Sequence, residues 1–86
     1  MKVVMKPVDM VAWFTSQGDL RPVRFRFLQE GEYKTVKVDR VVEEEEQKQA
    51  GIRLKVYRCQ SVIKETEKVY ELAYEVNTCK WHLYKI

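Results

Sequence analysis

The sequence predicts an all-β protein: a small antiparallel meander of five or six strands, arranged as a curled sheet or a partly open barrel. Composition is the first reason, because Val, Ile, Thr, Phe, Tyr and Trp fill 30 of the 86 positions, whereas Ala and Leu together fill only 8. Side chains that branch at Cβ or carry rings fit a pleated surface and crowd a helix turn. The second reason is that apolar and polar residues alternate from Pro22 onward with a period of two, as in a strand with one solvated face.

The length predicts a single domain, because a chain of 86 residues can bury one hydrophobic core but not two. We therefore expect one β domain over residues 1–86, with an amino-terminal segment at 1–20 and a meander at 22–86. Because open sheet edges need protection, the first segment is expected to add a strand or to cover the sheet as a lid. The alternative is an exposed docking arm. Its apolar side chains would be Met5, Met10, Trp13 and Phe14.

The alternation places the first hairpin at residues 22–42, with a turn at Gly31, where glycine can adopt positive φ. Residues 43–50 contain good helix formers but no apolar stripe, and a short undocked helix is marginal in water. We interpret them as a solvated hairpin tip, with or without a frayed helical turn. The next strand begins at Ile52, and its alternation loses phase after Arg58, which predicts a β-bulge.

Two further strands complete the predicted meander. Residues 69–76 alternate clearly, and a turn at 77–80 leads to a last strand that ends at Ile86. The apolar faces of all these strands should form the core. The expected core residues are Phe25, Phe27, Val36, Val38, Leu54, Val56, Leu72 and Leu83.

Positive charge is concentrated in the middle of the chain. Residues 21–58 contain ten basic and seven acidic residues, which accounts for the whole net charge of +3, and four of the acids lie at 43–46. If the alternation holds, several cations of three successive strands share one solvent face with a tyrosine beside them. These candidate site residues are Arg24, Arg26, Lys37, Arg53, Lys55 and Tyr57.

A basic sheet face with an aromatic neighbour predicts binding of single-stranded nucleic acid, because cations neutralise phosphates and rings stack on bases. The alternative is that these cations only keep a solvated strand face soluble and discourage edge pairing. The acidic run at 43–46 is interpreted as a solvated tip, or else as an acidic contact for a basic partner.

No catalytic constellation is recognisable. His82 is the only histidine, and a strand sends the side chains of Cys79 and His82 to opposite faces. A zinc site would require Cys59, Cys79 and His82 to converge from different strands. We therefore predict a protein without catalytic residues, metal or cofactor, and we interpret the cysteines as reduced thiols. No window approaches the ~18 apolar residues of a membrane span, and no signal-type segment is present, so a cytoplasmic protein without membrane association is expected.

A further pattern consists of an apolar strand, a polar turn and a strand that begins with tryptophan. It comprises Val69-Tyr70-Glu71-Leu72, Thr78 and Trp81-His82-Leu83-Tyr84, together with Pro22-Val23-Arg24-Phe25 and the strand around Tyr33 and Val36. Over about half to two thirds of the chain, this pattern resembles a family of short uncharacterised bacterial proteins encoded beside Y-family translesion DNA polymerases. The chain departs from that pattern at Cys79, where a turn glycine is expected, and at residues 52–58. The resemblance implies an accessory role in DNA repair and supplies no catalytic residues.

The expected function is therefore a non-catalytic binding module, namely a nucleic-acid-associated accessory protein that uses the basic sheet face. Its expected partner is single-stranded nucleic acid or a DNA-repair protein. The alternative is a protein–protein interaction module that acts through an edge strand, the apolar amino-terminal segment or the acidic hairpin tip. A second copy of the chain, paired through the sheet edges, is a further candidate partner.

Overall fold

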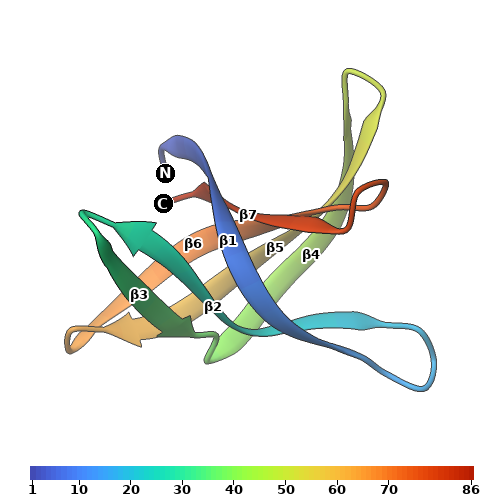
Figure 1. The fold of residues 1–86 in the computed structure, drawn as a ribbon. Helices are drawn as coiled ribbons and strands as arrows, with labels where there is room; N and C mark the ends of the chain where they lie inside the picture. The colour runs from blue at the N-terminus through green and yellow to red at the C-terminus, as the bar shows by residue number, and fades with distance from the viewer.

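Seven antiparallel strands and no helix make up the computed structural model of the chain, which describes residues 1–86 (Figure 1). The strands are β1 (Val3–Phe14), β2 (Leu20–Gln29), β3 (Glu32–Lys37), β4 (Arg40–Gln49), β5 (Ile52–Ile63), β6 (Thr66–Glu75) and β7 (Lys80–Lys85). The prediction of an all-β antiparallel sheet is confirmed. The predicted count of five or six strands is wrong, because the segment 33–42, expected as one strand, is divided between β3 and β4. No helix of the chain is long and apolar enough to cross a membrane.

Strand β1 joins the two halves of the sheet. The strand order is β3-β2-β1-β7-β6-β5-β4, so β1 pairs with β2 on one side and with β7 on the other. The structure has one open sheet and not the expected curled sheet or partly open barrel. The free edges of this sheet are β3 and β4. The chain ends lie side by side, where the Lys2 and Ile86 backbones exchange two hydrogen bonds of 2.8 and 3.0 Å (Figure 1).

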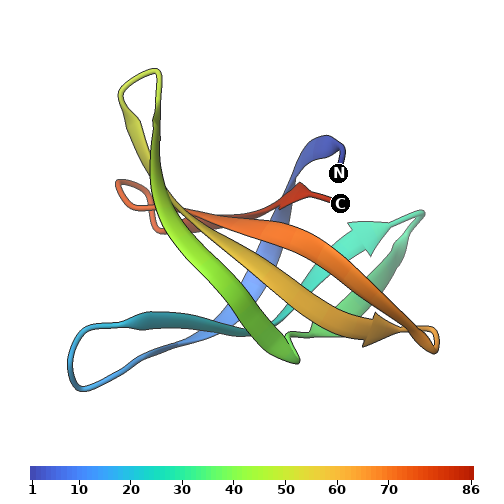
Figure 2. The same ribbon diagram turned by 180° about the vertical axis from the view of Figure 1, so that it is seen from behind.

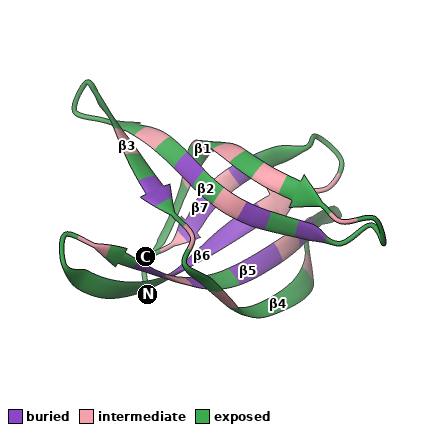
Figure 3. Cartoon of the chain, turned by 90° about the horizontal axis from the view of Figure 1, so that it is seen from below, coloured by how far each residue is buried: buried purple, intermediate pink, exposed green.

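Side chains from both halves of the sheet pack into one main core. Strand twist carries β2 and β3 across β5 and β6, so that the rings of Phe25 and Tyr70 lie 5.6 Å apart. Figure 3 shows the buried residues on β5 and β6, with shorter buried stretches on β2 and β3. The main core consists of Leu20, Phe25, Val36, Tyr57, Cys59, Tyr70, Leu72, Trp81 and Leu83.

A short relay of hydrogen bonds ties the connection between β3 and β4 to this core. The Ser61 hydroxyl donates to the Lys37 carbonyl at 2.6 Å, and the Tyr70 hydroxyl donates to Ser61 Oγ at 2.5 Å. Nearby, the Asp39 amide donates to the Gln60 carbonyl at 3.1 Å. A buried hydroxyl without a hydrogen-bond partner costs free energy of folding, so these hydrogen bonds hold the end of β3 in place over β5.

A second apolar cluster covers the opposite face of β5, β6 and β7. It contains Leu54, Val56, Ala73 and Tyr84. These strands are therefore buried on both faces over part of their length. This explains why the alternation of apolar and polar residues in β5 loses its phase, since the consecutive residues Val56 and Tyr57 are both buried. The expected bulge in this strand is not found, since β5 pairs with β6 residue for residue. The irregularity lies instead in β4, between Val41 and Glu43.

Residues 43–50 form neither a hairpin tip nor a helical turn. They belong almost entirely to the edge strand β4, which pairs with β5 along its length and is seen from behind in Figure 2. The turn is only Ala50-Gly51, with φ values of 50° and 81°, the geometry of a two-residue hairpin. This tight turn brings β5 back directly alongside β4. Residues 43–50 have only a weak preference for a helix, because they have no apolar stripe, and the hydrogen bonds between β4 and β5 outweigh that preference.

The core expected from the sequence is largely found. Phe27 and Val38 are partly buried and pack against the main core. The other six expected residues are buried, namely Phe25, Val36, Leu54, Val56, Leu72 and Leu83.

Truncation of Leu72 to alanine should lower the free energy of unfolding by about 2–5 kcal/mol, because this fully buried side chain would leave a cavity. Val69→Ala on the same strand is the matched control. Val69 is 42% exposed, so its truncation should cost about 1 kcal/mol or less. Urea unfolding followed by far-UV circular dichroism measures both. Wild-type stability of the Leu72→Ala variant, or a helix-dominated spectrum, would contradict the fold.

Candidate nucleic-acid interface

The face of β1, β2 and β3 that points away from the main core gathers cations and exposed rings. Phe25 points into the core between Arg24 and Arg26, which are exposed. Strand pairing aligns the outward side chains in rows, with Val11 opposite Arg24 and Arg24 opposite Lys37. We call this surface the basic aromatic face. Its exposed residues are Asp9, Val11, Trp13, Arg21, Arg24, Arg26, Leu28, Tyr33, Thr35 and Lys37.

Arg24 and Lys37 form a like-charged pair in the middle of this face. They are direct cross-strand partners on β2 and β3, and neither makes an ion pair. Like charges directly opposite each other destabilise a sheet, by up to about 1 kcal/mol. An anion bound between the two side chains would remove this repulsion and form charge-assisted hydrogen bonds with both.

The positive charge of Arg26, which lies beside this pair, is already balanced by an acidic partner. Its Nε donates to Asp9 Oδ2 at 2.9 Å, and this hydrogen bond raises the pKa of Arg26 above its ordinary value. The guanidinium also lies over the ring of Tyr33, 4.4 Å from its centroid. A cation over a ring face is attracted by the ring quadrupole, so Arg26 holds the Tyr33 ring in position.

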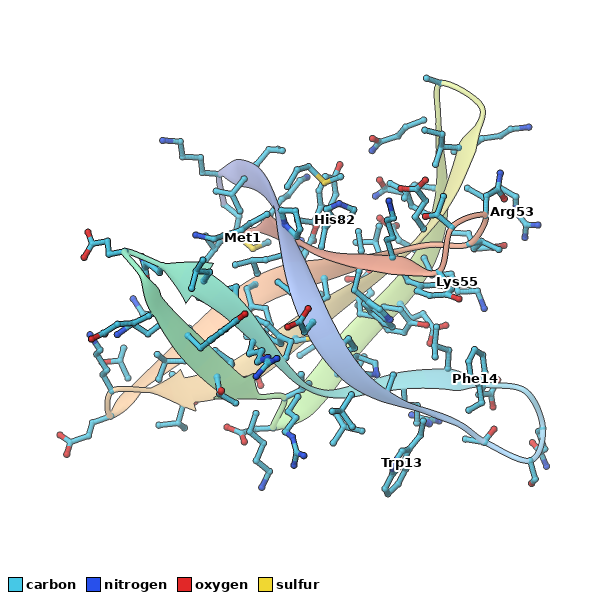
Figure 4. The ribbon with its side chains drawn as sticks, viewed as in Figure 1. Met1, Trp13, Phe14, Arg53, Lys55 and His82 are labelled. Atoms are coloured by element: carbon cyan, nitrogen blue, oxygen red, sulfur yellow. The ribbon has the colours of Figure 1, made fainter.

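Two exposed rings stand toward opposite ends of the basic aromatic face. Trp13 is 65% exposed and Tyr33 is 59% exposed. Figure 4 shows Trp13 pointing away from β1, with Phe14 on the other side of the chain. The middle rows contain a shallow depression of about 600 Å³, whose lining includes Val11, Arg24 and Thr35. Rings beside cations on a sheet are the groups that stack on bases and hold phosphates in single-stranded nucleic-acid complexes.

Arg53 and Lys55 do not share this face, contrary to the sequence-based expectation. In the sheet, β5 is separated from β2 by β6, β7 and β1, and Figure 4 places both residues on the β4–β5 hairpin. The acidic strand β4 also lies beside them, because Arg53 Nη2 donates to Glu46 Oε1 at 2.8 Å and Lys55 is the cross-strand neighbour of Glu46. Of the expected cations, the structure brings together only Arg24, Arg26 and Lys37.

Tyr57, the ring expected beside these cations, belongs to the main core and is only 1% exposed. Its hydroxyl donates to the Leu20 carbonyl at 3.1 Å, and its ring centroid lies 5.5 Å from that of Trp81. Burial raises the pKa of Tyr57 above its ordinary value. The expectation of a stacking role fails because the main core covers the face of β5 that carries Tyr57, whereas Leu54 and Val56 pack in the second cluster on the opposite face.

The sequence does contain a signal for the rings that take this place. Tyr33 lies two residues before Thr35 and four before Lys37, so the alternation that exposes Lys37 exposes Tyr33 as well. Trp13 and Phe14 are consecutive, so any strand that contains both must point one of them away from its core. No local pattern in the sequence predicts that β1 lies beside β2.

Cysteine and histidine side chains form no separate site. Cys59 is fully buried, which raises the pKa of its thiol to about 12, whereas Cys79 is exposed, and both are free. Cys79 adopts a φ of 60°, so this turn position would suit glycine. His82 Nδ1 is buried without a hydrogen-bond partner. No group of three or more His, Cys, Asp or Glu side chains is placed to hold a metal ion.

No protein-family model, curated protein or solved structure matches the chain.

Lys37→Glu should stabilise the fold, because it replaces the repulsion between Arg24 and Lys37 by a cross-strand ion pair. We expect a gain of about 0.2–1 kcal/mol in the free energy of unfolding at low salt, and a smaller gain at high salt. In an Arg24→Gln background the same substitution should gain nothing, which makes a double-mutant cycle. Urea unfolding measures all four proteins. An equal loss of stability from Lys37→Glu in both backgrounds would refute the repulsion.

Proposed function

We propose that the protein is a non-catalytic binding module that holds single-stranded nucleic acid on the basic aromatic face. The observation that carries this proposal is the unpaired, like-charged pair of Arg24 and Lys37. It lies on a surface whose two rings, Trp13 and Tyr33, are largely exposed. In this proposal the phosphates bind Arg21, Arg24 and Lys37, and the bases stack on the two rings.

One argument favours a single strand over a duplex. Rings can stack only on bases whose faces are free, and a duplex hides those faces in its own stack. The resemblance to proteins encoded beside translesion DNA polymerases supports the same class of ligand. On this proposal a DNA-repair protein in the cytoplasm is a further partner.

Binding of a fluorescently labelled oligothymidylate to the full chain tests the proposal, with fluorescence anisotropy measured over a range of salt concentrations. If three cations contact phosphates, affinity should fall with salt with a log–log slope of about −2, since each contact contributes about −0.7 on single strands. Arg24→Glu should weaken binding to all sequences and make the slope shallower by about 0.7. Tyr33→Ala should cost about 1–3 kcal/mol of binding free energy, because a stacked base is lost.

Lys55→Glu is the matched control, because it makes the same charge change on the β4–β5 hairpin. Lys55 lies on β5, which three strands separate from β2 in the sheet, so affinity should change by no more than about twofold. Absence of binding at low salt by the folded protein would refute the proposal. Equal losses from Arg24→Glu and Lys55→Glu would show that the face is not the site.

A protein-interaction role is the second candidate, and the edge strand β4 favours it. Its backbone is unpaired on one side, and it carries the acidic run Glu43–Glu46. An extended segment with basic side chains fits such an edge by adding a strand to the sheet, and a second copy of the chain fits it in the same way. Sedimentation over a range of protein concentrations tests the second-copy case, in which the sedimenting mass should rise with concentration.

A further inference from the structure

A groove on the core side of β2 and β3 forms a second surface, which faces away from the basic aromatic face. It encloses about 1060 Å³ at the end of the main core where β1 begins and β5 ends. Its apolar lining includes Phe25, Phe27, Val36 and Tyr70. This volume is close to the upper range of small-molecule pockets, which are mostly apolar and contain few polar groups.

Every charged side chain that lines this groove is a lysine, and no Asp or Glu lines it. The four are Lys6 of β1, Lys34 and Lys37 of β3, and Lys64 of the turn between β5 and β6. Only Lys34 has an acidic partner, Glu32, at 3.2 Å. Lys6 Nζ lies 5.1 Å from the ring centroid of Phe27, directly on the apolar lining.

Protection of a sheet edge does not explain all four lysines. Cations on an edge strand discourage pairing with other chains, which accounts for Lys34 and Lys37 on β3. Lys64 lies in a turn, so this reason does not apply to it, and Lys6 lies in the first part of β1, which pairs with β7 but not with β2. Their shared feature is that both line the groove.

The backbone of β1 is distorted at the same place. Its pairing with β7 shifts between Val3 and Lys6, so that Val4 and Met5 form a bulge. Met5 has a φ of 40° and is the only non-glycine residue inside a strand with positive φ. Both bulged residues line the groove. Strained backbone of this kind persists where the surroundings impose it, and it clusters at ligand sites.

We propose that the groove binds a single-chain amphipathic carboxylate of the fatty-acid class. The apolar tail lies on Phe25, Phe27 and Tyr70, and the carboxylate lies between the ammonium groups of Lys6 and Lys64. Charge complementarity selects an anion, because the side chains of the lining include four lysines and no Asp or Glu. The apolar lining selects a long tail over a small hydrated anion, whose water shell the groove could not replace. The site uses the face of β2 opposite to that of the nucleic-acid proposal, and the two sites share Tyr33, Thr35 and Lys37 of β3.

Titration of the full chain with sodium dodecanoate, below the concentration at which it forms micelles, tests this inference by calorimetry and by ¹H–¹⁵N NMR. Dodecanoate should bind with a stoichiometry of one and shift the amide signals of Val36, Ile63 and Tyr70. Dodecyltrimethylammonium is the matched probe, with the same tail and the opposite charge. It should bind at least about tenfold more weakly, because the lysines repel it.

Two sets of variants assign the contribution of the lysines. The double variant Lys6→Met and Lys64→Met keeps the apolar stems and removes the charges, so it should weaken dodecanoate binding by about tenfold while it binds the cationic probe better. The control variant Lys48→Met and Lys80→Met removes two exposed lysines outside the groove and should leave both affinities unchanged. Oligothymidylate binding should survive in the groove variant, which separates this site from the basic aromatic face.

Three outcomes would overturn the inference. The first is the absence of saturable dodecanoate binding. The second is equal binding of the two probes, which would show that charge selects nothing. The third is a set of signal shifts confined to the exposed Trp13–Phe14 tip, which would place the tail outside the groove.

Discussion

The pairing of β1 with β7 is the interaction on which the rest of the structure depends. It is the only ladder that joins the meander β1–β3 to the meander β4–β7, with Val8 opposite Trp81 and Lys6 opposite Leu83. Without it the chain would form two small sheets, and the main core, which takes residues from both, would be divided. This ladder also closes nearly the whole chain into a loop, so it carries the largest loop-closure entropy, and we expect it to form after the local hairpins.

The place of the acidic run decides which cations remain available on the surface. Because β4 folds back along β5, Glu43 lies opposite Arg58 and Glu46 lies opposite Lys55. Arg58 is further engaged by the buried carboxylate of Glu71, at 3.0 Å. The basic residues of β5 are thus balanced within their own half of the sheet. On the basic aromatic face, the only ion pair made by the cations of β2 and β3 is that of Arg26 with Asp9, so this half of the sheet has a positive face, and Lys34, on the other face of β3, pairs with Glu32.

Local alternation was sufficient to predict the strands that have one buried face, and it correctly placed Phe25, Val36 and Leu72 in the core. It failed where a strand is buried on both faces, since the phase at Tyr57 depends on two separate clusters. Alternation also failed to predict β4. The residues of β4 have the composition of a solvated tip, and it is the two-residue turn at Ala50 that brings them into pairing with β5. The place of β1 inside the sheet and the distortion at Met5 arise from pairing between the first and last strands, which no local pattern encodes.

The central claim is that the face of β1–β3 that points away from the core is a binding surface, separate from the groove behind it and from the β4–β5 hairpin. The most direct test is a ¹H–¹⁵N NMR titration of the full chain with oligothymidylate at low salt. The account predicts shifts at Val11, Arg24, Thr35 and Lys37 and at the indole N–H of Trp13, with the amides of Arg53 and Lys55 unmoved. Shifts that concentrate on the β4–β5 hairpin, or no shifts at all, would contradict it.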